Sequence, residues 1–499
     1  MIKRHPLLLP GAAAVALVLL RSAVWTVWEQ SDFDADQAIV GLMAKHLAEL
    51  RAFPLYFYGQ HYLLGVEAWI AAPFFLVFGV SVPVLKTPLV LMNIAIALLL
   101  LRCLVRDEKL RPWQAFAASL FFVLPPPAPA SRLLASNGGN VEPFLYTLIL
   151  WLTRGRPVVF GLAAIVGLAH REYTLYALVA IVLLELWEGR LLTRTNVRDK
   201  AIASGVIALG AGLLALLKGH ADLGGPGTAG TPGYGAVSAQ FGALTARFCW
   251  NPALLIPNLR WLVGENLSVI FGWREGPLST YAASGLRVGH AWAWLPIAVL
   301  IAAAAIGPVT AKSTPPAHRS GFAAYLILVG LQSALVYATL GCLVQDHMLI
   351  RYTLLTLYIP IGICAYALSG VPSKPVVWLS TCVIAAWAIA AGADQTRLLA
   401  EYVRHPPPSH IRELANYLES EGVKYGQAGY WTAYLIDFLT NERLLFSSFE
   451  KVRIVEYQKV LEEHDRQSVI VSPNPPCGRA GIAFREYCIN VLERARHAR

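Results

Sequence analysis

Long apolar stretches recur along most of this 499-residue chain and constrain its fold more than any other feature. A helix needs about 20 apolar residues to cross a bilayer. With 56% hydrophobic and 14% charged residues, the chain does not have the composition of an ordinary soluble protein. A polytopic α-helical membrane protein is predicted, with about eleven spans, the middle ones short, at 7–28, 80–101, 113–124, 141–152, 158–169, 173–187, 201–217, 291–309, 322–343, 353–368 and 376–391.

Charged residues between the apolar stretches indicate the orientation of the chain. Residues 1–5 are basic, and the apolar run that follows has no small-residue cleavage site before Trp25, which is typical of an uncleaved signal anchor. The loops at 102–111 and 189–200 are rich in Arg and Lys, which places them on the cytoplasmic side. The N-terminus is therefore expected inside and, with an odd number of spans, the C-terminus outside. The net charge of +10 is attributed to cytoplasmic loops, and no nucleic-acid partner is expected.

One apolar segment is interpreted as lying on the outer face instead of crossing the membrane. Residues 62–78 are apolar, but Gly65, Glu67 and Pro73 interrupt them. We expect a surface helix there, packed within the first outer loop (29–79).

The composition changes after residue 393, where a transmembrane domain spanning 1–393 is predicted to end. Residues 394–499 are charged and mixed, and they predict a small α/β domain on the outer face. The expected elements are helices at 411–421 and 431–439 and strands at 426–428, 444–446 and 468–471. Cys477 and Cys488 flank a loop in this domain, and either a disulfide or two buried thiols fits the pattern.

Three aspartates follow the first apolar stretch, namely Asp32, Asp34 and Asp36. Carboxylates at the membrane surface are unfavourable without a partner or a function. Asp36 is placed to cap the helix that residues 38–50 predict. One cap does not explain three carboxylates, so a catalytic base or a metal site facing the outer aqueous phase is the alternative interpretation.

Two further polar clusters occur at the outer ends of later spans. Asn140 and Glu142 follow a pair of glycines, which suits either a plain turn or close approach of the backbone to a ligand. His170, Arg171 and Glu172 separate two short apolar stretches. Ionisable residues in such a place are expected to be paired, as Arg171 and Glu172 could be, or functional.

A fourth cluster contains His347, Arg351 and Tyr352 and opens a late span. Arg351 suits a phosphate, whereas Arg351 and Tyr352 together also suit a simple anchor at the membrane interface. All four clusters fall on the outer side. Carboxylates combined with Arg and His at an outer face predict chemistry on a lipid phosphate, in which a base deprotonates a hydroxyl and cations stabilise the departing phosphate.

Several short motifs resemble those of the GT-C glycosyltransferases. The similar group is the bacterial branch related to protein O-mannosyltransferases and lipid A aminoarabinose transferase (glycosyltransferase family 39-like). The motifs that carry the resemblance are Asp36-Gln37-Ala38, Gly41-Leu42-Met43-Ala44, Phe57-Tyr58-Gly59-Gln60-His61-Tyr62, Glu67-Ala68, Arg351-Tyr352, Tyr430-Trp431-Thr432-Ala433-Tyr434 and Phe438-Leu439.

This resemblance implies a GT-C fold in which Asp36 is the catalytic carboxylate. Members of the family commonly have Glu after this Asp, whereas this chain has Gln37, so that Asp34 becomes the alternative second carboxylate. Glu142 is the candidate acid of the next outer loop. Asp36 and Glu142 are also the candidate ligands of a divalent cation, Mg or Mn, which the chemistry does not require.

The resemblance further implies the substrates and the cellular location. The donor is a sugar on polyprenyl phosphate, transferred with inversion to a hydroxyl of a lipid, glycan or protein acceptor at the bacterial inner membrane. The candidate donor- or phosphate-binding residues are His170, Arg171, Arg351, Tyr352 and His61.

Other functions compete with this hypothesis. A multi-pass transporter would place its charges near the bilayer midplane, often within inverted repeats. A lipid-linked polysaccharide ligase or polymerase would rely on His and Arg in a large outer loop. A membrane partner without enzymatic activity is the remaining alternative. Consumption of a polyprenyl-phosphate sugar separates the transferase from all three.

Overall fold

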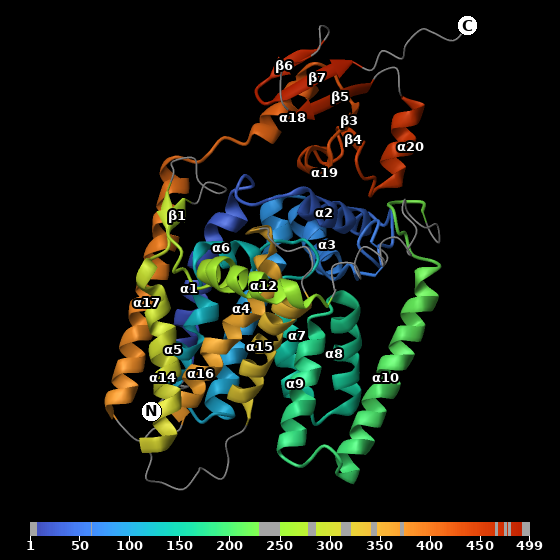
Figure 1. Cartoon of the computed structure of the whole chain (residues 1–499). Coiled ribbons are helices and arrows are strands. Elements are labelled where there is room, and N and C mark those ends of the chain that lie inside the picture. The colour runs from blue at the N-terminus through green and yellow to red at the C-terminus, as the bar shows by residue number, and fades with distance from the viewer. Residues whose placement is uncertain are drawn as a thin grey trace, which may run out of the picture.

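The computed structural model describes residues 7–60, 62–228, 250–277, 286–310, 321–340, 347–369, 374–464, 468–473, 477 and 481–491. A helix bundle forms one half of the molecule, two helices lie across its end, and a small sheet domain covers them (Figure 1). Each apolar stretch expected to span the membrane forms a helix: α1 (Leu8–Val27), α4 (Val82–Arg106), α5 (Pro112–Val123), α7 (Glu142–Thr153), α8 (Pro157–His170), α9 (Thr174–Trp187), α10 (Arg194–Lys218), α14 (Leu295–Thr310), α15 (Phe322–Leu340), α16 (Tyr358–Ser369) and α17 (Lys374–Arg404).

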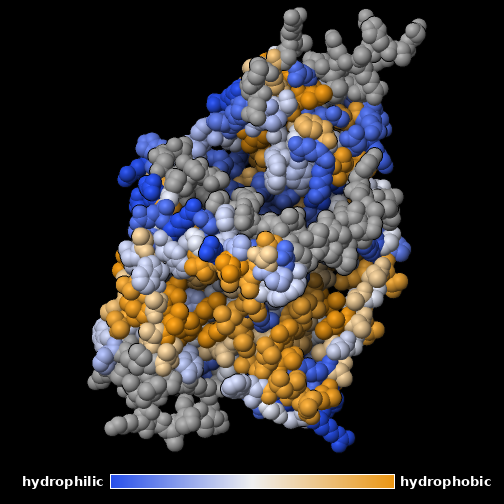
Figure 2. All heavy atoms as spheres, in the orientation of Figure 1, coloured by the Kyte–Doolittle hydropathy of each residue, from blue (hydrophilic) through white to orange (hydrophobic). Residues whose placement is uncertain are grey.

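The length and composition of the bundle helices suit a membrane. Among the described residues, six helices are long and apolar enough to cross a bilayer, and five shorter apolar helices accompany them. Figure 2 shows an apolar band over the bundle and hydrophilic residues over the sheet domain. α10 lies at the edge of the bundle and packs closely against α8, because a Cβ atom at Gly161 of α8 would press on Val206, and one at Gly210 of α10 would press on Ile165. The chain is a multi-pass membrane protein.

Short elements cover the outer end of the bundle, which is the end beneath the sheet domain (Figure 1). The surface helix expected at 62–78 is present as α3, and it pairs with the helix of the acidic loop, α2. The described residues between α10 and α14 also form short helical elements that the sequence analysis did not foresee. The short elements are α2 (Ala35–Ala48), α3 (Val66–Phe78), α6 (Pro127–Arg132), η1 (Pro252–Leu254), α12 (Leu255–Trp261), the π-helix η2 (Leu262–Leu267), α13 (Ser268–Ile270), β1 (Gly276–Pro277), β2 (Arg287–Val288), η3 (Ala291–Trp294) and η4 (His347–Leu357).

The C-terminal domain is the expected α/β unit. Its five strands have the order β4-β3-β5-β7-β6, in which β3 pairs in parallel with β4 and β5, and β7 pairs antiparallel with β5 and β6. Cys477 and Cys488 form a disulfide beside this sheet. The elements are α18 (His410–Ser420), β3 (Tyr425–Ala428), α19 (Tyr430–Leu439), β4 (Leu445–Ser448), α20 (Val455–Glu463), β5 (Ser468–Pro473), β6 (Ile482–Phe484) and β7 (Tyr487–Val491).

The predicted domain boundary at residue 393 lies within a continuous helix. The change in composition after residue 393 falls inside α17, which continues to Arg404. Gln395 within this helix donates to the carbonyl of Pro125, and Tyr402 packs edge-on against Trp28, the residue that follows α1. The charged end of α17 is therefore part of the bundle, and the sheet domain begins at α18.

Candidate active site

The cap of α2 is Asp34, so the expectation that Asp36 caps this helix was wrong. The backbone of Asp34 is extended, and its side chain accepts a hydrogen bond of 3.0 Å from the amide of Gln37. Asp36 lies in the first turn of the helix. Both aspartates precede helical residues at positions that a cap can occupy, and only the backbone conformation distinguishes them.

The three aspartates of the loop have different partners. Asp32, with a backbone φ of +61°, lies 3.5 Å from the guanidinium of Arg132. Lys86 is buried, and its ammonium group interacts electrostatically with the carboxylates of Asp32 and Asp34. Asp36 accepts a hydrogen bond of 2.5 Å from the hydroxyl of Tyr430 in the C-terminal domain. Asp32 and Asp34 thus have their partners within the loop and among the neighbouring helices, and Asp36 is the carboxylate directed toward the sheet domain.

The side chain of Gln37 makes one hydrogen bond as a donor and one as an acceptor, and an ionised glutamate could not make both. Its amide nitrogen donates to the carbonyl of Asp32 at 2.6 Å, and its amide oxygen accepts from the backbone of Ser136 at 3.2 Å. The side chain is fully buried. Because a carboxylate has no N–H to donate, Gln is required to join the first outer loop to the second.

The glycine pair of the second outer loop is held by Glu67. One carboxylate oxygen accepts from the amide of Gly139 at 2.7 Å, and the other accepts from the amide of Gly138 at 2.8 Å. Both glycines have φ near +90°, at +90° and +96°, which favours glycine. Burial raises the pKa of Glu67, while the two amides and the charge of Arg171 act in the opposite direction.

Glu142 lies at the start of α7, next to Glu67. It is 1% exposed, and its oxygens accept no hydrogen bond from the described residues. Asn140 donates to Asn137 at 2.7 Å and is buried within the loop. The loop therefore places two acidic side chains together, with Glu67 as the member that the sequence analysis did not nominate.

The third cluster approaches this loop from the end of α8. A Cβ atom at Gly139 would lie 2.6 Å from Cγ of Arg171 and 3.1 Å from the His170 ring. His170 is buried and bonds through Nδ1 to the hydroxyl of Tyr146 at 2.9 Å. Arg171 donates to the carbonyl of Asn137 at 3.3 Å. Glu172 is exposed and is not part of this group.

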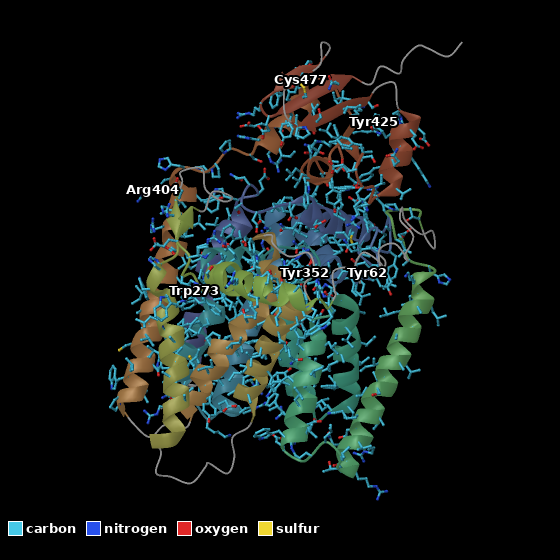
Figure 3. The ribbon with its side chains drawn as sticks, in the orientation of Figure 1. Tyr62, Trp273, Tyr352, Arg404, Tyr425 and Cys477 are labelled. Carbon is cyan, nitrogen blue, oxygen red and sulfur yellow. A yellow bond between two sulfur atoms is a disulfide. The ribbon has the colours of Figure 1, made fainter. Side chains whose placement is uncertain are left out.

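The fourth cluster contacts the third through one edge-to-face pair of aromatic rings. Tyr352 packs edge-on against Tyr173, with ring centroids 6.1 Å apart. Arg351 donates to the hydroxyl of Tyr352 at 3.2 Å and lies within electrostatic reach of Asp36. Figure 3 places Tyr352 and Tyr62 where the bundle meets the outer helices. The guanidinium of Arg351 thus connects the first cluster to the others.

The structure does not describe two of the candidate side chains. His61 lies outside the described residues, and His347 begins η4 with no description of its side chain.

The arrangement does not provide a metal site among the residues described. No group of three or more His, Cys, Asp or Glu side chains in that part of the chain could hold a metal ion. The two proposed ligands lie in separate environments, since Asp36 bonds to Tyr430 and Glu142 lies beside Glu67.

Replacing Asp34 with Asn should stabilise the protein at neutral pH. Burial raises the pKa of Asp34 to about 6, and the charges of Asp36 and Asp32 add to this effect. A carboxyl group with a raised pKa contributes its full stability below its unfolded pKa of about 4, and loses that contribution as the pH rises through about 6. Asn caps a helix about as well as Asp and does not ionise.

We expect the thermal midpoint of Asp34→Asn to exceed that of the wild type at pH 7 and to match it near pH 4. The measurement is thermal unfolding of the detergent-solubilised proteins at both values. Equal midpoints at pH 7 would show that the buried charge of Asp34 is not destabilising.

Sequence reasoning missed the residues that act from a distance. Tyr430 and Arg453 come from the C-terminal domain, and Lys86 comes from the start of α4. Glu67 had a usable signal, because an ionisable residue at the start of an apolar helix is unfavourable unless it has a partner. Tyr430 lies 394 residues from Asp36, and no local pattern connects them.

The fold of this chain is similar to the folds of two solved membrane proteins. No family model and no curated protein sequence matches the chain. ArnT from Cupriavidus metallidurans bound to undecaprenyl phosphate matches with a TM-score of 0.56 over 97% of this chain and 98% of that chain, at 10% identity. The oligosaccharyltransferase AglB from Archaeoglobus fulgidus, in complex with an inhibitory peptide and a dolichol-phosphate, matches with a TM-score of 0.50 at 12% identity, over 94% of this chain and 70% of that chain. At these identities the likeness confirms the fold that the sequence motifs implied.

Proposed function

We propose that this protein is a membrane glycosyltransferase that moves a sugar from a polyprenyl-phosphate donor to an acceptor hydroxyl. The observation that carries the proposal is that Asp36, held by Tyr430, and Arg351, held by Tyr352, lie within electrostatic reach of each other at the outer end of a GT-C-like bundle. Asp32 and Asp34 have structural partners, so Asp36 is the aspartate of its loop best placed for chemistry. The bound undecaprenyl phosphate and dolichol-phosphate of the two matched structures support a donor of this class.

The proposed reaction is a single displacement with inversion. The acceptor oxygen bonds to the anomeric carbon while the bond from that carbon to the phosphate oxygen breaks. Asp36 takes the proton of the acceptor hydroxyl, as a general base. The lipid phosphate leaves as an anion, and the guanidinium groups of Arg351 and Arg171 stabilise its charge. A phosphate leaving group needs little protonation, so no paired acid is required.

The supporting residues organise this centre. Glu67 fixes the glycine turn against which Arg171 lies, and Tyr352 orients Arg351. Glu142 is proposed to position the donor, since it is buried beside Glu67 without a hydrogen-bond donor of its own. The acceptor is a hydroxyl of a lipid, glycan or protein, reached from the side of the sheet domain.

The test is consumption of donor by purified protein. The protein in detergent is mixed with undecaprenyl-phosphate-linked monosaccharides (a hexose, a pentose and an aminopentose) and with a membrane extract as acceptor. Mass spectrometry then follows release of undecaprenyl phosphate and gain of sugar by the acceptor. We expect one donor to be consumed. Folded protein that cleaves none of them, yet moves a lipid-linked sugar across a vesicle membrane intact, would favour a transporter.

We also propose that the active site and the sheet domain face outward from a bacterial inner membrane. Leu50 follows α2 and is 89% exposed, and Arg194 begins α10 at the opposite end of the bundle (Figure 1). A membrane-impermeant maleimide added to intact spheroplasts should label Leu50→Cys above the parent protein and leave Arg194→Cys unlabelled until the membrane is opened. The reverse pattern would invert the topology and place the proposed chemistry in the cytoplasm.

A further inference from the structure

The C-terminal domain contacts the acidic loop along a whole helix. α19 packs along α2, and the closest approach is at Gly41, where a Cβ atom would overlap the ring of Phe438. Phe438 is buried and also packs against Phe33 and Phe75, with ring centroids 5.5 Å and 6.3 Å away. Because only glycine leaves room for this ring, the sequence of α2 is adapted to the docked domain.

The end of α2 that carries Asp36 receives a hydrogen bond from this domain. The hydroxyl of Tyr430 donates to Oδ1 of Asp36 at 2.5 Å. Nε of Arg453 donates to the same hydroxyl at 3.3 Å, and NH1 of Arg453 donates to the carbonyl of Gly59 at 3.0 Å. Since Arg453 can only donate, it occupies an acceptor position on the Tyr430 oxygen and leaves the hydroxyl proton for Asp36.

The surroundings of Tyr430 keep this hydroxyl protonated. Tyr430 is 7% exposed, and burial followed by the charge of Asp36 raises its pKa above the ordinary value. The backbone amide of Tyr430 donates to Glu450 at 3.1 Å, which anchors the start of α19. The hydroxyl is therefore a fixed donor aimed at the proposed base.

The other end of α2 is attached to the domain through Glu442. This carboxylate accepts from Nε2 of His46 at 3.0 Å and from Arg51 at 2.7 Å, and it also pairs with Lys45. Tyr457 donates to it at 2.8 Å. Burial opposes ionisation, but these donors hold the pKa of Glu442 well below its usual value. Glu442 fixes the register of α19 on α2 and thereby the position of Tyr430.

We propose that Tyr430 is a positioning residue for the base and that docking of the C-terminal domain completes the active site. This inference rests on the proposed function, in which Asp36 takes the acceptor proton. With Oδ1 held by Tyr430, Oδ2 faces the acceptor in a fixed direction, and the carboxylate is stabilised in its ionised form. The domain is thus a part of the catalytic unit, in addition to any contact that it makes with the acceptor.

The experiment compares Tyr430→Phe with Tyr434→Phe, using the undecaprenyl-phosphate-linked sugar that the wild type consumes. Tyr434 lies one turn further along α19, and its hydroxyl bonds to the backbone of Lys451 and Arg453 instead of Asp36. Both variants lose one buried hydroxyl, so the pair separates a general loss of packing from loss of the bond to Asp36. Tyr430→Phe should lower kcat about 10- to 100-fold, the range for one hydrogen bond to a charged group, with KM for the donor unchanged.

The pH dependence supplies the second readout. Without the Tyr430 donor the carboxylate binds a proton more readily, so the acid limb of kcat/KM should move to higher pH. The charged groups that face Asp36 are Arg351, Arg453 through Tyr430, and Asp34. Profiles are recorded in the Asp34→Asn background, because Asp34 itself titrates near pH 6. Tyr434→Phe should leave the acid limb in place.

The outcomes separate this inference from the proposed function. If Asp36→Asn is inactive but Tyr430→Phe keeps the wild-type kcat and acid limb, Tyr430 does not position the base and the inference is wrong. Equal losses in both Phe variants with an unmoved limb would also reject it, since that pattern is structural. If Asp36→Asn retains full turnover, or no donor is consumed, the proposed function fails and the inference fails with it.

Discussion

Asp36→Asn is expected to lower turnover about 10²–10⁴-fold, which is the usual contribution of a general base. The amide has the size of the carboxylate, and its oxygen can still accept the hydrogen bond from Tyr430. It cannot take a proton from the acceptor. The helix cap is provided by Asp34, so the substitution leaves the start of α2 intact.

The measurement is release of undecaprenyl phosphate at saturating donor, with the thermal midpoint recorded for the same preparation. Asp32→Asn is the matched control, because it removes a charge of the same loop whose partner is Arg132. Asp32→Asn should lower the thermal midpoint, and its turnover should fall much less than that of Asp36→Asn. Wild-type turnover in Asp36→Asn would end the assignment of Asp36 as the base, since its role as a helix cap is already excluded.

Hydropathy was sufficient to predict the bundle. Each expected apolar stretch forms a helix, because the rule that governs it is local: every backbone group in a bilayer needs a partner within its own segment. The C-terminal α/β unit could also be predicted, from the change in composition and the short apolar strands. Its β6, β7 and α20 were missed, as they are short and mixed in sequence.

Local patterns could not assign the roles of neighbouring polar residues. Asp34 and Asp36 both precede helical residues, and the backbone conformation selects Asp34 as the cap. Gln37 looked like a departure from the family pattern, yet it bridges two outer loops with a donor and an acceptor. Arg171 and Glu172 are neighbours in the sequence and could have formed a pair, but Arg171 contacts the glycine turn while Glu172 is exposed. These distinctions depend on which loops meet, and the sequence alone does not specify that.

Glu67→Gln is expected to weaken both folding and turnover, because it breaks a buried clamp on the glycine turn. Both oxygens of Glu67 accept from backbone amides, those of Gly139 and Gly138. In Gln one of these oxygens becomes an NH₂ group, so whichever way the amide is turned, one N–H of the turn faces a donor. Leaving one buried donor unsatisfied should reduce the free energy of unfolding by about 1–3 kcal/mol.

The loss of turnover follows from the position of the turn. Arg171 packs directly on Gly139 and bonds to the carbonyl of Asn137, so a displaced turn moves a guanidinium proposed to bind the donor phosphate. The expected effect on kcat/KM is about 10²-fold, comparable to that of an ångström-scale misplacement. Turnover and thermal midpoint should therefore fall together in Glu67→Gln.

Glu142→Gln is the comparison that distinguishes the structural role of Glu67 in holding the glycine turn from a direct role of a carboxyl group in turnover. Glu142 is buried beside Glu67, but the amides of Gly138 and Gly139 donate to Glu67, so replacing Glu142 leaves the donors of the glycine turn paired. We expect this variant to keep the wild-type midpoint, or exceed it, while turnover falls. If Glu67→Gln instead unfolds at the wild-type midpoint and retains its turnover, the clamp is dispensable. If both variants lose stability equally, the two carboxyl groups act as one structural pair, and Glu142 has no separate part in binding the donor.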